Sequence, residues 1–432
     1  MHSHSLILIL FSLSFLTALA TSDKRYDLDG NGTPDLCTTN SGGTASCLLS
    51  NGSWTTFETS AYHSGMLAIS TKATAAATSS AKHASPQATG ILPDPATFKR
   101  DNGTKWSIKY VGNLAFTDTL QAKRLEGDKC RSGKLGNKVI WNCGDMECKG
   151  GWTVCGFSMG PAFYGTSSVM TVNTTGISLV QANDFIKPWS GDPKPVSPQT
   201  AFGMDTSNVA VINSTHGVAY AWEIWRGASD GSFGNRGNAV VSVTLGAQKP
   251  IATRRGPLLT GPHALALGML AILRDGDFIY TYSIGGPSGI IIGRVKASDA
   301  VFSASEYAFL KAGSESTWVT PGTIPNATTT AYGMTTSNSG GKFSCNVYGS
   351  VFFNAYLNRY VIICTAFEHF TNMYISSTPW GPWSAEYGLL NGWGVGYGSM
   401  AHPEYSTDGG KTFHFSQGPD SVFNVFKVSF DF

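Results

Sequence analysis

His402 and Glu404 are two titratable side chains that lie two residues apart near the C-terminal end of the chain. In an extended strand, alternate side chains point to the same face, so the imidazole and the carboxylate are expected to point the same way. Pro403 lies between them and cannot donate a hydrogen bond to a neighbouring strand, which is typical of an edge strand or a strand end. The pair indicates either a site that moves protons on a substrate or a buried pair that satisfies backbone groups.

Three further carboxyl groups are candidates to act with Glu404. Asp145 follows an apolar strand, Asp205 precedes the run VAVI, and Glu223 lies within AYAWEIW, where burial would raise its pKa. Hydrolysis of a glycosidic bond needs one acid that protonates the leaving oxygen and one carboxylate that activates water or attacks the sugar. These four residues are therefore the predicted catalytic set. The structural alternatives are turn capping by the two aspartates and an ion pair between Glu223 and Arg226.

Two histidines and one tryptophan are predicted to contact substrate. His263 and His402 are candidates to orient a sugar hydroxyl or, in a lyase, to move a proton. Trp393 lies in the glycine-rich segment NGWGVGYG and is expected to form a pocket wall. The alternative for both histidines is a structural role near a strand.

The segment DLDGNGTPD near the N-terminus has the alternating oxygen ligands of a calcium loop. Its candidate ligands are Asp27, Asp29, Asn31 and Asp35. The glutamate of an EF-hand is missing, and an ion-free Asp/Gly turn is the alternative. Any calcium here is expected to be structural, and no cofactor is expected to be required for catalysis.

Composition points to a large all-β protein. The chain has 50 glycines, 12% aromatic residues and few segments with helical periodicity. Its net charge is only +2 and charged residues make up 13%, so no electrostatic footprint for nucleic acid or a membrane surface is present. We expect a monomer with neither nucleic acid nor a membrane as partner.

The N-terminus and the cysteines predict export. Residues 1–20 contain an apolar run that ends in small residues, which is typical of a secretory signal peptide. Eight cysteines in an exported chain predict up to four disulfides. Local pairs are expected between Cys37 and Cys47 and between Cys345 and Cys364, while the pairing among Cys130, Cys143, Cys148 and Cys155 stays open. Acceptor sequons for N-linked glycans occur at Asn51, Asn102, Asn173, Asn213 and Asn326.

The chain is predicted to comprise a small module, a linker and one large domain. Residues 26–71 hold the first cysteine pair, residues 72–92 are rich in Ala, Ser and Thr, and residues 93–432 are the large domain. Five similar stretches in the large domain read as propeller blades, at about 105–178, 200–248, 263–313, 343–390 and 397–432. The last is short, so the strand WSIKYVG near residue 106 is predicted to complete it and close the ring.

Several motifs in the large domain resemble known propellers. Ser406, Asp408, Gly410, Thr412 and Phe413 have the S-x-D-x-G-x-T-[FW] spacing of an Asp-box hairpin. WNCGD, FFNAYLNRYVIICTA, SSTPWGPWS and HPEYSTDGGKTF together resemble the fungal branch of an uncharacterised family of secreted five-bladed propellers. That family is similar in architecture to arabinanase-like glycosidases, and some bacterial members are similar to enzymes that degrade D-arabinan. The inserted cysteines and the N-terminal module depart from it.

Together these observations predict a five-bladed β-propeller with a small disulfide-clasped N-terminal module. The expected function is that of a secreted glycoside hydrolase that acts on a cell-wall or extracellular polysaccharide, and arabinan-like polymers are among the candidate substrates. Two alternatives stay open: a polysaccharide lyase on a uronic-acid polymer, with Arg254 or Arg255 neutralising the acid, and a carbohydrate-binding propeller without catalysis.

Overall fold

The structure is a computed structural model with two compact units, residues 1–85 with 406–409 and residues 86–405 with 410–432. It describes residues 36–39, 44–48, 54–58, 106–117, 125–148, 157–177, 179, 184–195, 199–227, 233–345, 348–366, 370–391, 397–418 and 423–431. In the first unit, β1 (Leu36–Thr39), β2 (Thr44–Leu48) and β3 (Trp54–Glu58) form an antiparallel sheet. Its register places Cys37 opposite Cys47, as a disulfide between them would require.

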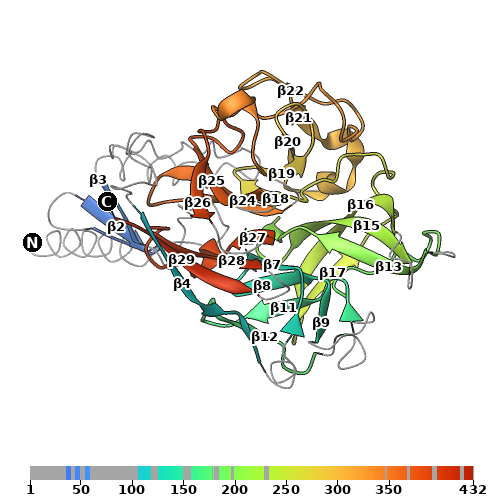
Figure 1. Cartoon of the computed structure of the whole chain (residues 1–432), viewed down its shortest axis with the longest axis horizontal. Coiled ribbons are helices and arrows are strands. Elements are labelled where there is room, and N and C mark those ends of the chain that lie inside the picture. The colour runs from blue at the N-terminus through green and yellow to red at the C-terminus, as the bar shows by residue number, and fades with distance from the viewer. Residues whose placement is uncertain are drawn as a thin grey trace, which may run out of the picture. The chain divides into compact units, whose positions relative to one another are not determined.

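Five sheets of the second unit are the blades of a β-propeller, which confirms the predicted fold (Figure 1). From the innermost strand outward, blade 1 is β7 (Lys129–Leu135), β8 (Lys138–Gly144), β11 (Ala162–Gly165), β12 (Thr171–Asn173) and β5 (Ala115–Phe116). Blade 2 is β13 (Gln199–Thr206), β15 (Gly217–Gly227), β16 (Phe233–Leu245) and β17 (Pro250–Arg254), with β14 (Ala210–Val211) also on β15.

The remaining blades follow in chain order. Blade 3 is β18 (Ala271–Asp275), β19 (Phe278–Ile284), β20 (Ile290–Lys296), β21 (Ala308–Leu310) and β22 (Trp318–Val319). Blade 4 is β23 (Gly349–Asn354), β24 (Arg359–Ala366), β25 (Phe370–Ser376) and β26 (Tyr387–Asn391). Blade 5 is β27 (Tyr397–Ala401), β28 (Thr412–Gly418), β29 (Asn424–Phe430) and β4 (Trp106–Asn113). A small separate sheet contains β10 (Phe157–Ser158), β9 (Met146–Cys148) and β6 (Leu125–Glu126).

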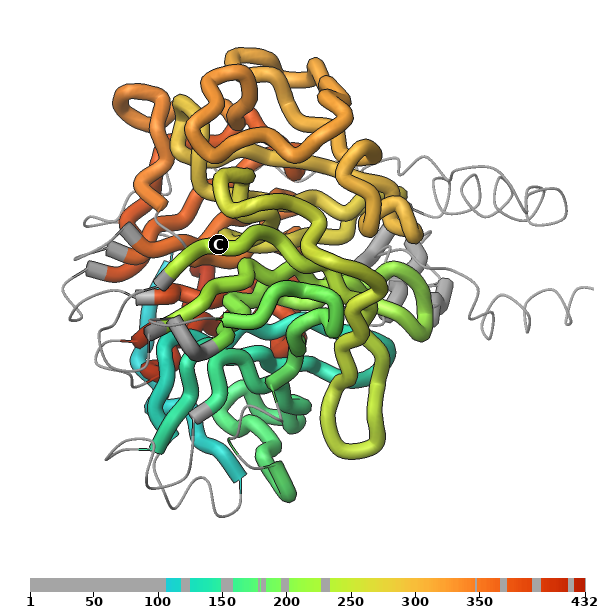
Figure 2. The backbone as a smooth tube through the Cα atoms, turned by 90° about the vertical axis from the view of Figure 1, so that its right-hand side faces the viewer, coloured from blue at the N-terminus to red at the C-terminus, as the bar shows by residue number. Residues whose placement is uncertain are grey.

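One inner strand from each blade faces a common axis, and in blade 2 this strand is β14. β7 contacts β14, β14 contacts β18, β18 contacts β23, β23 contacts β27, and β27 contacts β7 again. In Figure 2 the teal and green tube of blades 1 and 2 lies below the late, gold-coloured part of blade 3. Residues far apart in sequence are therefore brought together where these five strands begin.

The ring closes as the sequence predicted. β4, an N-terminal strand, pairs antiparallel with β29, so that Trp106 lies opposite Phe430 and Asn113 opposite Asn424. The backbone then enters β5 at the outer edge of blade 1, parallel to β12. Both ends of the second unit thus contribute hydrogen bonds to blade 5.

The described residues form five clusters of buried hydrophobic side chains, and each cluster lies between two neighbouring blades. Alternating side chains of each strand point to opposite faces of its sheet, so each blade packs against both neighbours. The Val and Ala residues of β15 and β16, for example, face Ile140 and Ala162 of blade 1. This packing fixes the position of every inner strand.

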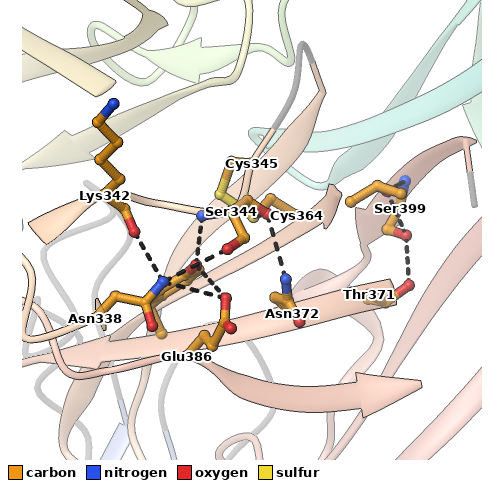
Figure 3. Close-up of a disulfide and its surroundings, with 11 residues drawn as sticks. Asn338, Lys342, Ser344, Cys345, Cys364, Thr371, Asn372, Glu386 and Ser399 are labelled. Atoms are coloured by element: carbon orange, nitrogen blue, oxygen red, sulfur yellow. Dashed lines mark hydrogen bonds between the residues drawn. A yellow bond between two sulfur atoms is a disulfide. The ribbon is translucent and has the colours of Figure 1, made fainter. Parts of the chain in front are cut away.

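Two disulfides are described: the one between Cys345 and Cys364 was predicted, and the one between Cys130 and Cys143 answers a pairing that the sequence left open. Cys130 is bonded to Cys143 across β7 and β8, and Cys345 to Cys364 in blade 4 (Figure 3). Cys148 is also disulfide-bonded. Beside the second disulfide, the Asn338 amide donates to the Lys342 carbonyl at 2.8 Å and to Glu386 at 3.2 Å (Figure 3).

One local prediction is wrong. β27 ends at Ala401, and Pro403–Tyr405 form the 3-10 helix η6 instead of a continued strand. Pro403, which cannot donate to a ladder, ends the strand and begins this turn. His402 and Glu404 therefore do not share the face of a strand, although both reach the same hydroxyl group by another route, as shown below.

Candidate functional site

An ion pair lies at the start of β7, the innermost strand of blade 1. Lys129, the first residue of β7, places Nζ 2.7 Å from Oδ1 of Asp205 on β13. Tyr348, one residue before β23, donates its hydroxyl to Oδ2 of Asp205 at 2.7 Å. The Lys129 ammonium also lies 3.9 Å from the centre of the Tyr348 ring. Three side chains from blades 1, 2 and 4 thus form one polar contact set.

The remaining two blades, 3 and 5, contact residues of β7. Arg131 on β7 is almost fully buried and donates to the carbonyl oxygens of Met269 and Leu270, just before β18 of blade 3. Gly398 on β27 of blade 5 has φ +62°, and a Cβ there would come within 2.9 Å of the Lys129 Cβ. Glycine is needed at this position both for its backbone conformation and for the close approach.

The charges around Asp205 keep it ionised. Burial alone would raise the pKa of this carboxyl, but Lys129, Arg131 and the hydrogen bond from Tyr348 outweigh burial and hold the pKa below its usual value. An opposite charge in direct contact favours the ionised form of an acid. Asp205 is therefore a carboxylate across the ordinary pH range.

The neighbouring residue in blade 1, Asp128, has the opposite character. Its pKa is raised to about 6, mainly by burial and also by the negative charges of Asp145 and Asp205, while the positive charges of Lys129 and Arg226 act in the opposite direction. Asp128 lies immediately before β7 and is half-buried. Asp128 is not among the residues predicted from the sequence.

Asp145 lies between blades 1 and 2. It follows β8 with φ +42°, a conformation that Asp adopts more readily than most residues. Its Oδ2 lies 2.6 Å from the Arg226 guanidinium of blade 2, and 21% of the Asp145 side chain is exposed. The pKa of Asp184 is raised to about 6, mainly by burial and to a smaller extent by the charge of Asp145. Asp184 also accepts a hydrogen bond from Ser158.

Glu223 belongs to a different set of partners. It is buried on β15, the second strand of blade 2, and accepts a hydrogen bond from the Trp225 indole at 3.2 Å. Arg254 lies 3.4 Å from Glu223 and 2.7 Å from Asp192. Burial and then the charge of Asp192 raise the pKa of Glu223. The ion pair foreseen between Glu223 and Arg226 is made with Arg254 instead.

Glu404 and His402 meet at Ser132 of β7. The Ser132 hydroxyl lies 2.8 Å from Nδ1 of His402 and 2.8 Å from Oε2 of Glu404. His402 is fully buried, its Nε2 lies 2.9 Å from the Ser416 hydroxyl, and its ring stacks on Trp141 at 4.2 Å. The imidazole thus has a partner on each nitrogen and no exposed surface for a substrate.

Burial shifts the pKa values of both His402 and Glu404. Burial, with a smaller contribution from His414, lowers the pKa of His402 to about 3, so the ring is neutral. Burial raises the pKa of Glu404, while its hydrogen bonds and the charge of Lys134 act in the other direction. These contacts join blade 5 to blade 1.

The other predicted site residues lie apart from these sets. His263 is exposed in the segment before β18. Trp393 and the calcium candidates Asp27, Asp29, Asn31 and Asp35 lie outside the described residues. Among the residues that the structure does describe, no group of three or more His, Cys, Asp or Glu side chains is placed to hold a metal ion.

Asp128 and Asp205 form the arrangement best suited to acid–base chemistry. Their environments move the two pKa values in opposite directions, which separates a proton donor from a carboxylate that stays ionised. The negative charge of Asp205 raises the pKa of Asp128, and Lys129 lies next to Asp128 in sequence and forms an ion pair with Asp205. In the described part of the chain, no helix is long and apolar enough to span a bilayer.

Comparison with known proteins finds distant structural likeness. No protein family and no curated protein matches the sequence. Among solved structures, an exo-β-1,3-galactanase from Phanerochaete chrysosporium in complex with galactose is 12% identical with a TM-score of 0.44, over 74% of this chain and 64% of that one. A GH43_1 enzyme from Xanthomonas citri in complex with xylose is 12% identical with a TM-score of 0.40, over 71% and 87%. A thermostable family-43 glycoside hydrolase is 10% identical with a TM-score of 0.35, over 73% and 91%. This distant likeness assigns no activity to the chain.

Proposed function

We propose that this chain is a glycoside hydrolase in which Asp128 is the general acid and Asp205 is the ionised carboxylate. The observation that carries the proposal is the opposed protonation of these two groups, one immediately before β7 and the other near the end of β13. Asp128 would protonate the leaving glycosidic oxygen, and Asp205 would activate water or attack the anomeric carbon. Lys129 and Tyr348 hold Asp205 in place through their 2.7 Å contacts.

Asp145 would tune the acid in this mechanism. Its negative charge disfavours ionisation of Asp128, while Arg226, paired with Asp145, favours it. Together they set how readily Asp128 gives up its proton. Glu223 and Glu404, which were predicted as catalytic residues, would instead be structural: Glu223 pairs with Arg254 within blade 2, and Glu404 joins blade 5 to blade 1 through Ser132.

The proposed substrate is a cell-wall or extracellular polysaccharide, with arabinan-like polymers included, and the proposed location is extracellular. The signal-like segment 1–20, the described disulfides and the sequons support this setting. No cofactor is needed in a mechanism that uses two carboxyl groups and water.

The test is a polysaccharide panel that includes arabinan, xylan and β-1,3-galactan, with new reducing ends as the readout. The variants Asp128→Asn and Asp205→Asn should each lower kcat/KM by about 10²- to 10⁴-fold. The matched control is Asp277→Asn, an exposed aspartate beside the β18–β19 turn, which should keep full activity. Products that absorb in the near ultraviolet would indicate a lyase, and retention of polysaccharide without products would indicate a binding protein. Either result would overturn the proposal.

A further inference from the structure

The tip of the β14–β15 hairpin carries the sequon Asn213-Ser214-Thr215 in a defined turn. Oδ1 of Asn213 accepts hydrogen bonds from the backbone nitrogens of Thr215 at 3.0 Å and His216 at 2.9 Å. The Thr215 hydroxyl lies 3.1 Å from the same oxygen. All of these bonds go to the amide oxygen. The exposed amide nitrogen, to which an N-linked glycan attaches, has no hydrogen-bond partner among the described residues.

A cavity of about 150 Å³ begins at this hairpin tip and extends between blades 2 and 3. Asn213 itself is part of the wall. Blade 2 also contributes Ser242, together with Arg255 after β17, and blade 3 contributes Asp299 and Phe302 of the 3-10 helix η3 (Asp299–Phe302). A sugar attached to Asn213 would therefore start at the edge of an existing cavity.

The walls have the chemistry that a sugar ring needs. The Arg255 guanidinium lies 2.6 Å from Asp299 and 4.4 Å from the centre of the Phe302 ring, so charged donors and acceptors adjoin an aromatic side chain. Ser242 adds a hydroxyl group. Pockets that bind small ligands combine apolar or aromatic walls with a few placed polar groups. A sugar ring offers apolar C–H faces and hydroxyl groups to match them.

We infer that Asn213 is N-glycosylated and that the first sugar of its glycan occupies this cavity. In the modification, the Asn213 amide nitrogen loses one hydrogen and bonds to the anomeric carbon of a sugar carried on a lipid pyrophosphate. The lipid pyrophosphate leaves with the bonding electrons, and the hydrogen departs as a proton. Once attached, the sugar binds the cavity intramolecularly, which gives it a high effective concentration there. It then joins blade 2 to blade 3.

Asn326 provides a matched comparison within the same chain. It is also an exposed sequon residue, and its backbone pairs with Ala264. The described cavity at Asn213 does not include it. A glycan on Asn326 would therefore not enter this cavity, so it should not stabilise the folded state through it.

The experiment uses the full chain secreted from a eukaryotic host, analysed by glycopeptide mass spectrometry and thermal unfolding. Mass spectrometry should find Asn213 glycosylated in the wild type and in Thr215→Ser, and unmodified in Asn213→Gln. Asn213→Gln should lower Tm by about 2 °C or more, whereas Asn326→Gln should leave Tm unchanged. Thr215→Ser, which keeps the sequon hydroxyl, should retain the wild-type Tm.

Enzymatic trimming separates the first sugar from the rest of the glycan. An endoglycosidase that leaves one sugar on Asn should preserve Tm, and an amidase that removes the whole glycan should lower it. That difference should disappear in Asn213→Gln. An unmodified Asn213 in the wild type, an unchanged Tm in Asn213→Gln, or equal Tm values after the two enzymes would each overturn the inference.

Discussion

Nζ of Lys129 lies 2.7 Å from Oδ1 of Asp205, and this ion pair connects the start of β7 in blade 1 to the end of β13 in blade 2. Only 4% of the Lys129 side chain and 18% of the Asp205 side chain are exposed. Water screens such a pair less than it screens a surface pair, and removal of one partner leaves the other charge buried. The pair therefore stabilises the ring and also fixes the protonation of Asp205.

Lys129→Met should affect both stability and pH dependence. Loss of the ammonium should lower the free energy of unfolding by about 3 kcal/mol at pH 7. Because the folded-state pKa of Asp205 is lowered, its contribution to stability is present above its unfolded pKa and is lost as pH falls through the folded value. The Tm difference from wild type should therefore shrink as pH falls. Lys138→Met, at an exposed lysine on β8, is the control and should change Tm little.

Asp145→Asn should shift the activity profile along the pH axis. Asn tolerates the positive φ of this position, so the main change is the loss of one negative charge. Without that charge, ionisation of Asp128 is easier and its pKa falls. The alkaline limb of kcat/KM should then move to lower pH. A limb that moved to higher pH would show that Asp145 does not act through Asp128.

Glu404→Gln separates the two roles considered for this residue. As a catalytic acid it would be essential, whereas as a partner of Ser132 it can be replaced by an amide with activity largely kept. Because its folded pKa is raised, stability from this group is present at low pH and is lost as pH rises through the folded value. The Tm of Glu404→Gln, measured relative to the Tm of the wild type, should therefore increase as pH rises. Complete loss of turnover in a folded variant would assign catalysis to Glu404.

Trp106→Ala should test closure of the ring. Trp106 is 4% exposed and packs edge-on against Tyr387 with ring centroids 6.3 Å apart. Its truncation should lower the free energy of unfolding by about 3 to 5 kcal/mol. Tyr110→Ala, at a residue of the same strand that is 40% exposed, should have a much smaller effect on urea unfolding. Equal effects would mean that β4 does not anchor the ring through Trp106.

The blades could be predicted from sequence because each contains apolar strands separated by Gly, Asp or Asn turns. The closing strand was also predictable, since WSIKYVG alternates and the last blade lacked a partner. The disulfide between Cys345 and Cys364 followed from their local spacing. These features depend on short-range patterns, which a single sequence contains.

The site was less predictable because its residues do not follow such patterns. β7 reads KCRSGKL, which is too polar to indicate an innermost strand, and its Lys129 and Arg131 are buried only because other blades supply their partners. Asp128 was therefore overlooked, although an acid directly before a strand that lines the axis was the available signal. The strand predicted through Glu404 rested on the two-residue spacing from His402, with Pro403 taken as compatible with an edge strand or a strand end, whereas Pro403 begins a 3-10 turn.

The most direct test of the central claim is the pH dependence of kcat/KM for the wild type and Asp128→Asn on the polysaccharide that the panel identifies. The wild type should lose activity as pH rises through about 6, because Asp128 must be protonated to act as the acid. Asp128→Asn should be slower by about 10²-fold or more and should lack that limb. A variant that kept wild-type activity with the same alkaline limb would contradict the assignment of Asp128 as the acid.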